Sequence, residues 1–368
     1  MVATLRAIRT AVPEHTLRQP EVAELFAAQP GLGRLATRLI GASFGVSGIE
    51  TRHTVIGELD GAGDEGVFLD RESGELRHPG TKVRNDLYTR EAGRLYVQAA
   101  RESLDAAPDL DAADVTHVIT VSCTGFFAPG PDFLIAQELG LRAGVQRYHF
   151  GFMGCYASMP ALRAAAQFCE ADPDAVVLIV SVELCTLHLR SADDQDSIIA
   201  ASLFADGAAA ALVTGRPTPV GETGLVIDRS ETVITPVGVG DMTWTIGDHG
   251  FEMVLSSYVP HIIDEHVDGA LAPLLGELAP SDVTHWAVHP GGRSILDKVE
   301  SRMGLSEAQL VPARETLRTF GNMSSATVLF VLRNILENSA PRHGDRLVAM
   351  AFGPGLTVES ALMTVEAG

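Results

Sequence analysis

Residues 151–157 read Gly-Phe-Met-Gly-Cys-Tyr-Ala, and this stretch decides how the surrounding chain folds. A short apolar run at residues 148–152 leads into it, and residues 158–170 after it carry a helical pattern. A cysteine bracketed by glycines between a strand and a helix is a nucleophile-elbow arrangement. The helix N-terminus would lower the pKa of the Cys155 thiol, and the backbone N–H groups could form an oxyanion hole. We therefore expect an α/β fold with Cys155 as nucleophile; the alternative is a buried core cysteine.

The rest of the chain alternates short apolar segments with helical patterns. One series runs to about residue 215, and a second begins near residue 221. This alternation predicts a mixed, mostly parallel sheet covered by helices. We expect two halves, residues 1–215 with the nucleophile and residues 216–368, although no sequence repeat is visible. Residues 57–86 lack hydrophobic periodicity and are expected to form an exposed loop before a helix from residue 87.

Composition and charge narrow the classes of function. The chain has 368 residues, of which 46% are hydrophobic and 20% charged, as in compact globular proteins. A net charge of −20 argues against nucleic acid as a partner, because phosphate binding needs a basic surface. There is neither a signal-peptide pattern nor an apolar run of roughly 18 residues, so we expect a cytoplasmic protein without a membrane span. The four cysteines show no metal-ligand spacing, and we expect no metal site.

A nucleophilic cysteine needs a base, and one of the twelve histidines stands apart. His289 follows the apolar residues 286–288 and precedes Pro-Gly-Gly, at the strand end where α/β folds place their sites. Cysteine and histidine together form a thiolate–imidazolium couple that is nucleophilic at neutral pH. Asn322 lies in a polar turn, residues 321–325, that opens an apolar helix. It is either a functional amide or simply a helix cap.

Taken together, these segments resemble the chalcone synthase-like type III polyketide synthases of the thiolase superfamily. The matching segments, in chain order, are GFMGCYA at 151–157, LFADGAA at 203–209, WAVHPGG at 286–292, FGNMSSATVLF at 320–330 and AFGPGLTVES at 351–360. The resemblance covers essentially the whole chain and is weakest before residue 48 and through residues 57–86.

The resemblance implies a thiolase fold, with two stacked five-stranded mixed sheets and helices between and outside them in αβαβα layers, assembled as a homodimer. It also implies a decarboxylating Claisen acyltransferase with acyl-CoA and malonyl-CoA as substrates and no cofactor. Cys155 would carry the starter acyl group as a thioester. His289 and Asn322 would stabilise the enolate and the oxyanion, and Phe204 would orient the malonyl unit and exclude water.

Several other positions bear on the starter. Thr124, Ala128 and Cys185 fall where mycobacterial long-chain alkylpyrone synthases line an acyl tunnel, and small side chains there leave room for an alkyl chain. Flexible Met253 replaces the family's gatekeeping Phe, and His188 replaces a small polar residue. Alternatively, these are ordinary packing residues. The turn residues Phe352, Gly353 and Pro354 are also expected in the pocket.

The expected CoA contacts are fewer than in relatives, which usually carry several Lys and Arg in the helix before residue 48. Residues 41–49 have none. The remaining candidates for CoA binding are Arg38, Arg52, Arg293, Gly292 and Ser294. Because of the net charge, delivery of the starter by an acyl carrier protein is an alternative.

The resulting prediction is iterative extension of a medium- or long-chain aliphatic starter to an alkylpyrone or alkylresorcinol. One alternative is a ketoacyl-acyl carrier protein synthase, which shares the Cys–His–Asn set but typically lacks the turn at residues 352–356. Another is a non-catalytic thiolase-fold binding or scaffold subunit, against which the presence of all three residues counts.

Overall fold

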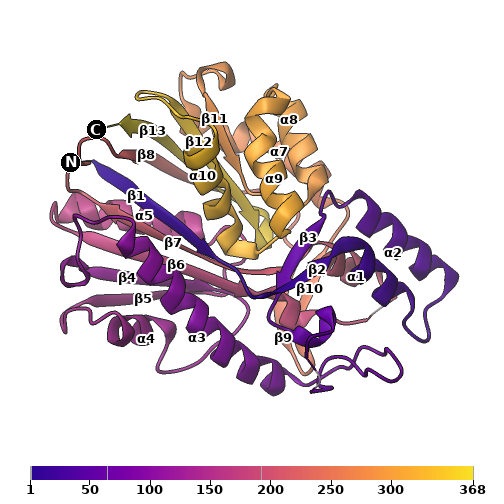
Figure 1. Ribbon diagram of the computed structural model, residues 1–368. Helices are drawn as coiled ribbons and strands as arrows, with labels where there is room; N and C mark the ends of the chain where they lie inside the picture. The colour runs from indigo at the N-terminus through magenta and orange to yellow at the C-terminus, as the bar shows by residue number, and fades with distance from the viewer. Residues whose placement is uncertain (1, 64, 192, 368) are drawn as a thin grey trace.

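The computed structural model describes residues 2–63, 65–191 and 193–367 (Figure 1). Within these residues there are thirteen strands and ten α-helices. The strands are β1 (Ala3–Ala11), β2 (His15–Arg18), β3 (Thr51–Thr54), β4 (His117–Ser122), β5 (Gln146–Gly151), β6 (Val176–Leu184), β7 (Asp206–Thr214), β8 (Thr223–Ile234), β9 (Met242–Gly247), β10 (Gly250–Leu255), β11 (His285–Val288), β12 (Arg346–Gly353) and β13 (Thr357–Ala367). The helices are α1 (Gln19–Ala27), α2 (Arg34–Val46), α3 (Thr81–Asp105), α4 (Pro131–Glu138), α5 (Ser158–Ala171), α6 (Gln195–Leu203), α7 (Val259–Leu275), α8 (Arg293–Met303), α9 (Glu307–Phe320) and α10 (Thr327–Asn338).

Nine strands form one mixed sheet in the order β11-β12-β13-β8-β1-β7-β6-β4-β5. Strands β1 and β4 to β7 belong to the first half of the chain, and β8 and β11 to β13 to the second. The halves join where residues 3–5 of β1 pair with residues 225–227 of β8. The expected α/β fold class is confirmed, but the two groups of strands are hydrogen-bonded into one sheet instead of forming two separate five-stranded ones.

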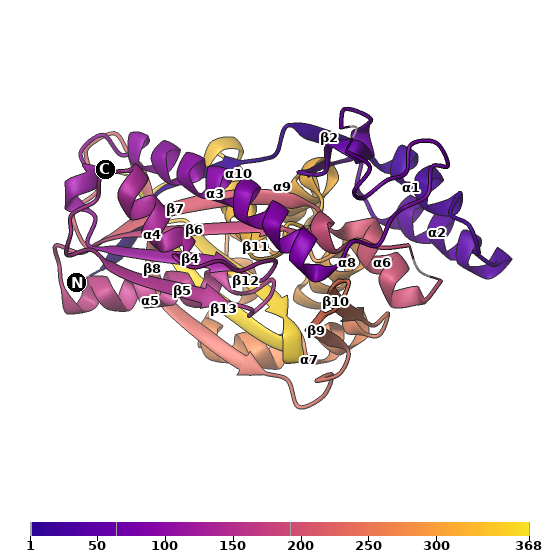
Figure 2. The same ribbon diagram turned by 90° about the horizontal axis from the view of Figure 1, so that it is seen from below.

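Helices lie between the two groups of strands and on their outer faces (Figures 1 and 2). Helix α5 contacts β1, β4, β6 and β7 on one side and β13 on the other, and α10 contacts both β1 and β7 and β11 and β12. Helix α3 packs on the first group of strands, while α7 packs on β8 and β13 and α9 on β11. The sheet therefore curls around two buried helices, which gives the layer order helix, strands, helices, strands, helix.

Residues 57–63 and 65–80 form turns, a short 3-10 helix at Gly57–Asp60 and an isolated bridge between Leu69 and Leu76. The predicted loop extended to residue 86, and this is wrong at its end because α3 begins at Thr81. The first turns of α3 are polar and show no hydrophobic period. Arg84 anchors them instead, with Nε donating to Pro79 O at 2.8 Å and Nη1 to Leu189 O at 3.2 Å.

In the part of the chain that the structure describes, no helix is both long and apolar enough to cross a membrane.

Candidate active site

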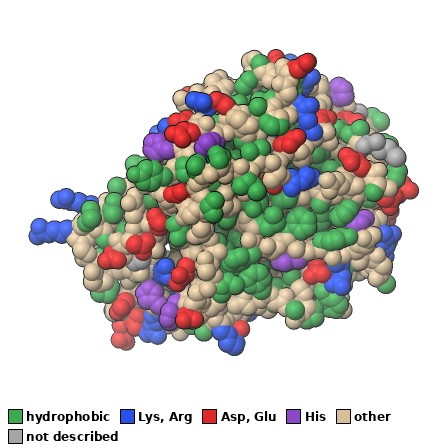
Figure 3. All heavy atoms as spheres, turned by 180° about the vertical axis from the view of Figure 1, so that it is seen from behind, with side chains coloured by type: hydrophobic (Ala, Val, Ile, Leu, Met, Phe, Trp, Pro, Cys, Tyr) green, Lys and Arg blue, Asp and Glu red, His purple; other side chains and the backbone are tan. Residues whose placement is uncertain are grey.

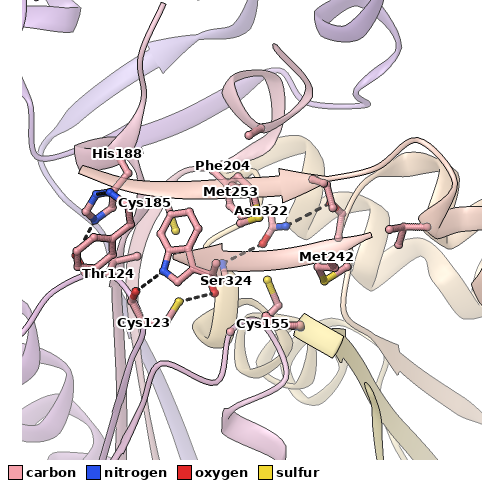
Figure 4. Close-up of a pocket in the computed structure, with 18 of the residues that line it drawn as sticks. Cys123, Thr124, Cys155, Cys185, His188, Phe204, Met242, Met253, Asn322 and Ser324 are labelled. Atoms are coloured by element: carbon pink, nitrogen blue, oxygen red, sulfur yellow. Dashed lines mark hydrogen bonds between the residues drawn. The ribbon is translucent and has the colours of Figure 1, made fainter. Parts of the chain in front are cut away.

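One cavity brings together the side chains of Cys155, Phe204, His289 and Asn322. Figure 4 labels Cys155, Phe204 and Asn322 among its lining residues. Each comes from the end of a different element: Cys155 before α5, Phe204 between α6 and β7, His289 after β11, and Asn322 after α9. All four residues are buried, with exposed fractions of 8% or less. The cavity offers about 80 Å³ to the centre of a water molecule, against the roughly 10–15 Å³ that one buried water needs.

The turn before Cys155 is held by backbone geometry that the glycines permit. Gly154 has φ 82°, and a Cβ there would lie 2.4 Å from Pro354 Cδ. Phe152, with φ 60°, also has a left-handed backbone, and its N–H donates to Ser122 O at 3.0 Å. The turn 352–354 therefore packs directly on the elbow, which fixes the thiol at the cavity wall.

Asn322 is held by hydrogen bonds of both its backbone and its side chain. Its backbone N–H donates to Leu203 O at 2.9 Å, and its backbone O accepts from the N–H of Ala205 at 2.9 Å. Its side-chain Oδ1 accepts from the Ser324 N–H at 2.9 Å, and Nδ2 donates to Gly291 O at 3.2 Å. Asn322 is thus both a local cap and an amide aimed between the His289 turn and the cysteine.

The ionisation of the Cys–His pair differs from the sequence-based expectation. Burial raises the pKa of the Cys155 thiol to about 12, although Ser324 and Asn322 lower it in part. Burial also lowers the pKa of His289 to about 3, and neither ring nitrogen has a hydrogen-bond partner among the described residues. The expected lowering of the Cys155 pKa by the helix N-terminus is therefore outweighed by desolvation. Each group alone stays neutral, and charge can form only as a pair in which each ion compensates the other.

A carboxyl group that the sequence reasoning missed lies beneath the cavity. Glu183 is fully buried in β6 and accepts from Thr124 Oγ1 at 2.8 Å, from Cys123 N at 3.0 Å and from Ser325 Oγ. Burial raises its pKa above the usual range. A glutamate inside the mostly apolar run of residues 176–184 was the available signal, because such a position needs satisfied hydrogen bonds.

Most other predicted pocket residues line the cavity. These are Thr124, Cys185, His188, Met253, Phe352 and Pro354, whereas Ala128 and Gly353 are not among the lining residues.

His188 closes one end of the cavity. Its Nε2 donates to Thr124 O at 2.8 Å, and its Nδ1 accepts from the Phe251 N–H at 3.0 Å. Its ring stacks on Phe251 with centroids 4.2 Å apart and meets the edge of Trp244. Trp244, another residue that the sequence reasoning missed, donates from Nε1 to Cys123 O at 2.7 Å. This aromatic wall is rigid because each polar edge of the His and Trp rings is bonded to the backbone.

One predicted CoA contact is wrong. Arg52 is fully buried, and its Nη1 donates to Ala201 O at 2.8 Å and to Phe204 O at 2.7 Å. Its guanidinium therefore supports the backbone of a cavity residue and does not face solvent. The sequence shows an arginine near the expected CoA helix but not that β3 directs its side chain inward.

The other CoA candidates are scattered. Arg38 is exposed on α2. Arg293 lines a second, more open cavity and lies 3.7 Å from Asp297. Ser294 is exposed and Gly292 buried, and their neighbours Gly291 and Ile295 line the main cavity instead.

No group of three or more His, Cys, Asp or Glu side chains among the described residues is arranged to hold a metal ion.

Comparison with known proteins agrees with this geometry. The sequence profile of chalcone and stilbene synthases matches residues 1–217 with its N-terminal domain and residues 227–366 with its C-terminal domain. The chain belongs to the chalcone and stilbene synthase family. It is therefore a type III polyketide synthase, an acyltransferase that carries out decarboxylative Claisen condensation, as the resemblance predicted.

Similar proteins span its whole length. A 1,3,6,8-tetrahydroxynaphthalene synthase of Streptomyces coelicolor is 33% identical, over 98% of this chain and 92% of that protein. The alpha-pyrone synthesis polyketide synthase-like Pks18 of Mycobacterium tuberculosis is 32% identical, over 99% and 91%. Among solved structures, PKS-I of the brown alga Ectocarpus siliculosus has a TM-score of 0.89 at 29% identity, covering 99% of this chain and 98% of that one.

Proposed function

We propose that this type III polyketide synthase extends an aliphatic acyl starter, held on Cys155, with malonyl-CoA and releases an alkylpyrone or alkylresorcinol. The supporting observation is the aliphatic lining of the cavity. This lining consists of Met242, Met253, Leu255, Val259, Ile263 and Ile295. Such a surface gains about 0.8 kcal/mol per methylene buried.

In this proposal Cys155 Sγ adds to the carbonyl carbon of the starter thioester while His289 takes its proton. The CoA sulfur then leaves with that proton, and an acyl-cysteine remains. Malonyl-CoA next loses CO2, and the enolate oxygen that forms accepts hydrogen bonds from His289 and Asn322. The enolate carbon attacks the acyl carbonyl, Cys155 leaves as thiolate, and the extended chain is bound to CoA.

The electrostatics of the cavity support this sequence. A neutral imidazole donates a hydrogen bond without a counterion, and an amide held by Gly291 and Ser324 is already oriented. Because His289 and Asn322 are almost fully buried, their bonds to a developing negative charge are not weakened by water. Phe204, which is 6% exposed, would keep this region dry.

A second candidate is a synthase that starts from a small acyl group. The cavity volume of about 80 Å³ and the wall of His188, Trp244 and Phe251 favour it. One relative of this chain is named as a synthase of tetrahydroxynaphthalene, which is a compact aromatic molecule. Only the starter distinguishes the two candidates, because the condensation is the same.

The test is mass spectrometry of products from purified enzyme given malonyl-CoA and acyl-CoA starters of increasing length. The aliphatic proposal expects pyrone or resorcinol masses that rise with the starter and vanish in Cys155→Ala. A single product that forms from malonyl-CoA alone and ignores added starters would establish the second candidate instead.

The donor of the starter is open to a separate test. We propose CoA delivery assisted by Arg38, with an acyl carrier protein as the alternative. Arg38→Glu should then raise KM for the acyl-CoA starter as well as for malonyl-CoA, whereas the matched control Arg142→Glu, an exposed arginine after α4, should not. An unchanged KM in Arg38→Glu would remove Arg38 from the CoA site.

We also propose that the enzyme needs no cofactor and works as a homodimer. The boundary between its two halves is proposed to lie between residues 215 and 216. Figure 3 supports an association surface, since groups of hydrophobic side chains lie toward the middle of the face it shows, with charged side chains around them. Sedimentation at several concentrations checks the oligomeric state: a dimer is expected, and a monomer throughout would contradict it.

A further inference from the structure

A small apolar cavity lies beneath residues 57–63 and 65–79, outside the catalytic cavity. Its lining residues are Phe26, Ile56, Leu59, Phe68, Leu76, Arg77, Thr186 and Leu189. Six of these are large hydrophobic side chains, and the one charged member, Arg77, has a side chain that is 52% exposed and is paired with Asp70. The cavity is thus apolar inside and reaches the surface beside Arg77.

Leu189 lines both this cavity and the catalytic one. It follows the 3-10 turn Cys185–His188, and its N–H donates to Thr186 O at 3.1 Å. Its side chain is only half-buried and belongs to a segment without regular structure. A change of its rotamer would therefore connect the two spaces without breaking a backbone hydrogen bond.

The cavity wall at Phe251 is more firmly packed than the wall at Leu189. Phe251 lines the catalytic cavity and contacts Phe126 and Phe152, with ring centroids 5.9 Å and 5.7 Å away. Phe126 and Phe152 also contact each other at 5.7 Å. Opening this side would separate three mutually packed rings, whereas opening the other side moves one leucine.

The covering segment is held at residues 67–69 and at residue 76, so that the cavity persists. Glu58 accepts hydrogen bonds from the N–H groups of Val67, Phe68 and Leu69 at 2.7 to 2.9 Å. Gln29 accepts from the Leu76 N–H at 2.7 Å. A void lined by such side chains is unattractive to water and favourable for hydrocarbon.

We propose that the far end of the aliphatic starter passes Leu189 and occupies this cavity, here called the tail cavity. The inference rests on the proposed aliphatic starter and adds where its tail lies. As it stands, the tail cavity offers about 20 Å³ to the centre of a water molecule, enough for about one water. Displacement of Leu189 adds the volume of that side chain, and further methylenes can follow.

The test compares kcat/KM for starters from butyryl-CoA to palmitoyl-CoA, each expressed relative to butyryl-CoA. Leu189→Ala should raise the ratio for long starters, and Leu76→Phe, which fills the tail cavity from the covering segment, should lower it. Each methylene gained or lost is worth about fourfold in kcat/KM. Leu189→Trp is a second blocking variant should Leu76→Phe fail to fold. Leu336→Ala, a half-buried leucine packed on the larger core, is the control and should keep the wild-type ratios.

Opposite shifts in the opening and blocking variants would support the tail cavity. Wild-type ratios in Leu189→Ala and in a folded blocking variant would overturn it while leaving the aliphatic starter intact. Failure of the proposed function looks different, since the wild-type enzyme would then turn over malonyl-CoA but incorporate no alkyl starter of any length.

Discussion

Phe204 and Asn322, two residues of the catalytic cavity, are joined by an isolated parallel β-bridge. Arg52 lies behind this bridge: it donates to Phe204 O, and a Cβ on Gly321 would lie 2.8 Å from its Cγ. One buried side chain therefore supports two segments that meet only at the site. Burial lowers the pKa of Arg52 to about 10, partly offset by the nearby carboxyl group of Asp206, so Arg52 stays charged at neutral pH.

Replacing Arg52 should loosen both cavity residues. Arg52→Met leaves Ala201 O and Phe204 O without their donor, and each buried carbonyl left unpaired costs about 1–3 kcal/mol of unfolding free energy. We expect a lower melting temperature and a fall in kcat for malonyl-CoA decarboxylation at nearly constant KM. Arg52→Lys should recover part of both. A rise in KM in both variants, with an unchanged melting temperature, would instead indicate that Arg52 contacts the substrate.

Alkylation of Cys155 should depend on His289. Only the thiolate reacts, and burial raises the pKa of the thiol to about 12, so without a proton acceptor its reactivity must climb through the alkaline range. In the wild type, His289 can accept the proton as the thiolate forms. Iodoacetamide labelling at pH 7 should therefore fall at least about tenfold in His289→Ala and recover only as the pH rises. Superimposable pH profiles for the two proteins would mean that the imidazole does not assist.

Truncation of His188 should enlarge the cavity at its closed end. His188→Ala removes a ring that stacks on Phe251 and leaves Thr124 O and the Phe251 N–H without partners. We expect products with more extension units and a protein destabilised by about 2–4 kcal/mol. His188→Gln, which keeps a polar side chain but no ring, separates the two effects. Product masses unchanged in both variants would show that the wall does not limit extension.

The buried carboxyl of Asp206 should make stability depend on pH. Burial raises its pKa from 3.8 to about 7. The hydrogen bonds that Asp206 accepts from the side chain and backbone of Thr186 and from the backbone of Val55 oppose this rise, as does the charge of Arg52. Between about pH 4 and 7 the folded protein then binds this proton more tightly than the unfolded chain. The free energy of unfolding falls as pH rises through that window, by up to about 1.4 kcal/mol per pH unit, and levels off above it.

Urea denaturation of the wild type and of Asp206→Asn at several pH values measures this slope. The variant should be less stable overall, but its free energy of unfolding should fall less steeply between about pH 4 and 7 than that of the wild type. The buried Glu183 accounts for some of the fall that remains. Parallel curves for the two proteins would assign the decline to other groups.

Elements with a clear hydrophobic period could be predicted from the sequence. The apolar run at residues 175–182 is β6, and the pattern after the cysteine is α5. The hairpin β9–β10 was missed because its strands are half-exposed and mix polar with apolar residues. Helix α9 was missed as well, since Pro312 inside it suggests a break.

The residues of the site also divide into those that the sequence predicts and those that it does not. Cys155, His289 and Asn322 could be found because each lies beside glycine turns at the end of an apolar element. Arg52 was wrongly assigned to CoA and Glu183 was missed, because their roles depend on which way a strand directs a charged side chain. That direction is set by packing against segments distant in the chain, such as residues 201–204 and 325.

The most direct test of the account is intact-protein mass spectrometry after incubation with an acyl-CoA starter alone, followed by peptide mapping. The account predicts one added acyl mass on the peptide that contains Cys155, lost in Cys155→Ala and released when malonyl-CoA is added. An acyl group on Cys123 or Cys185, or none on the wild-type protein while product still forms, would contradict it.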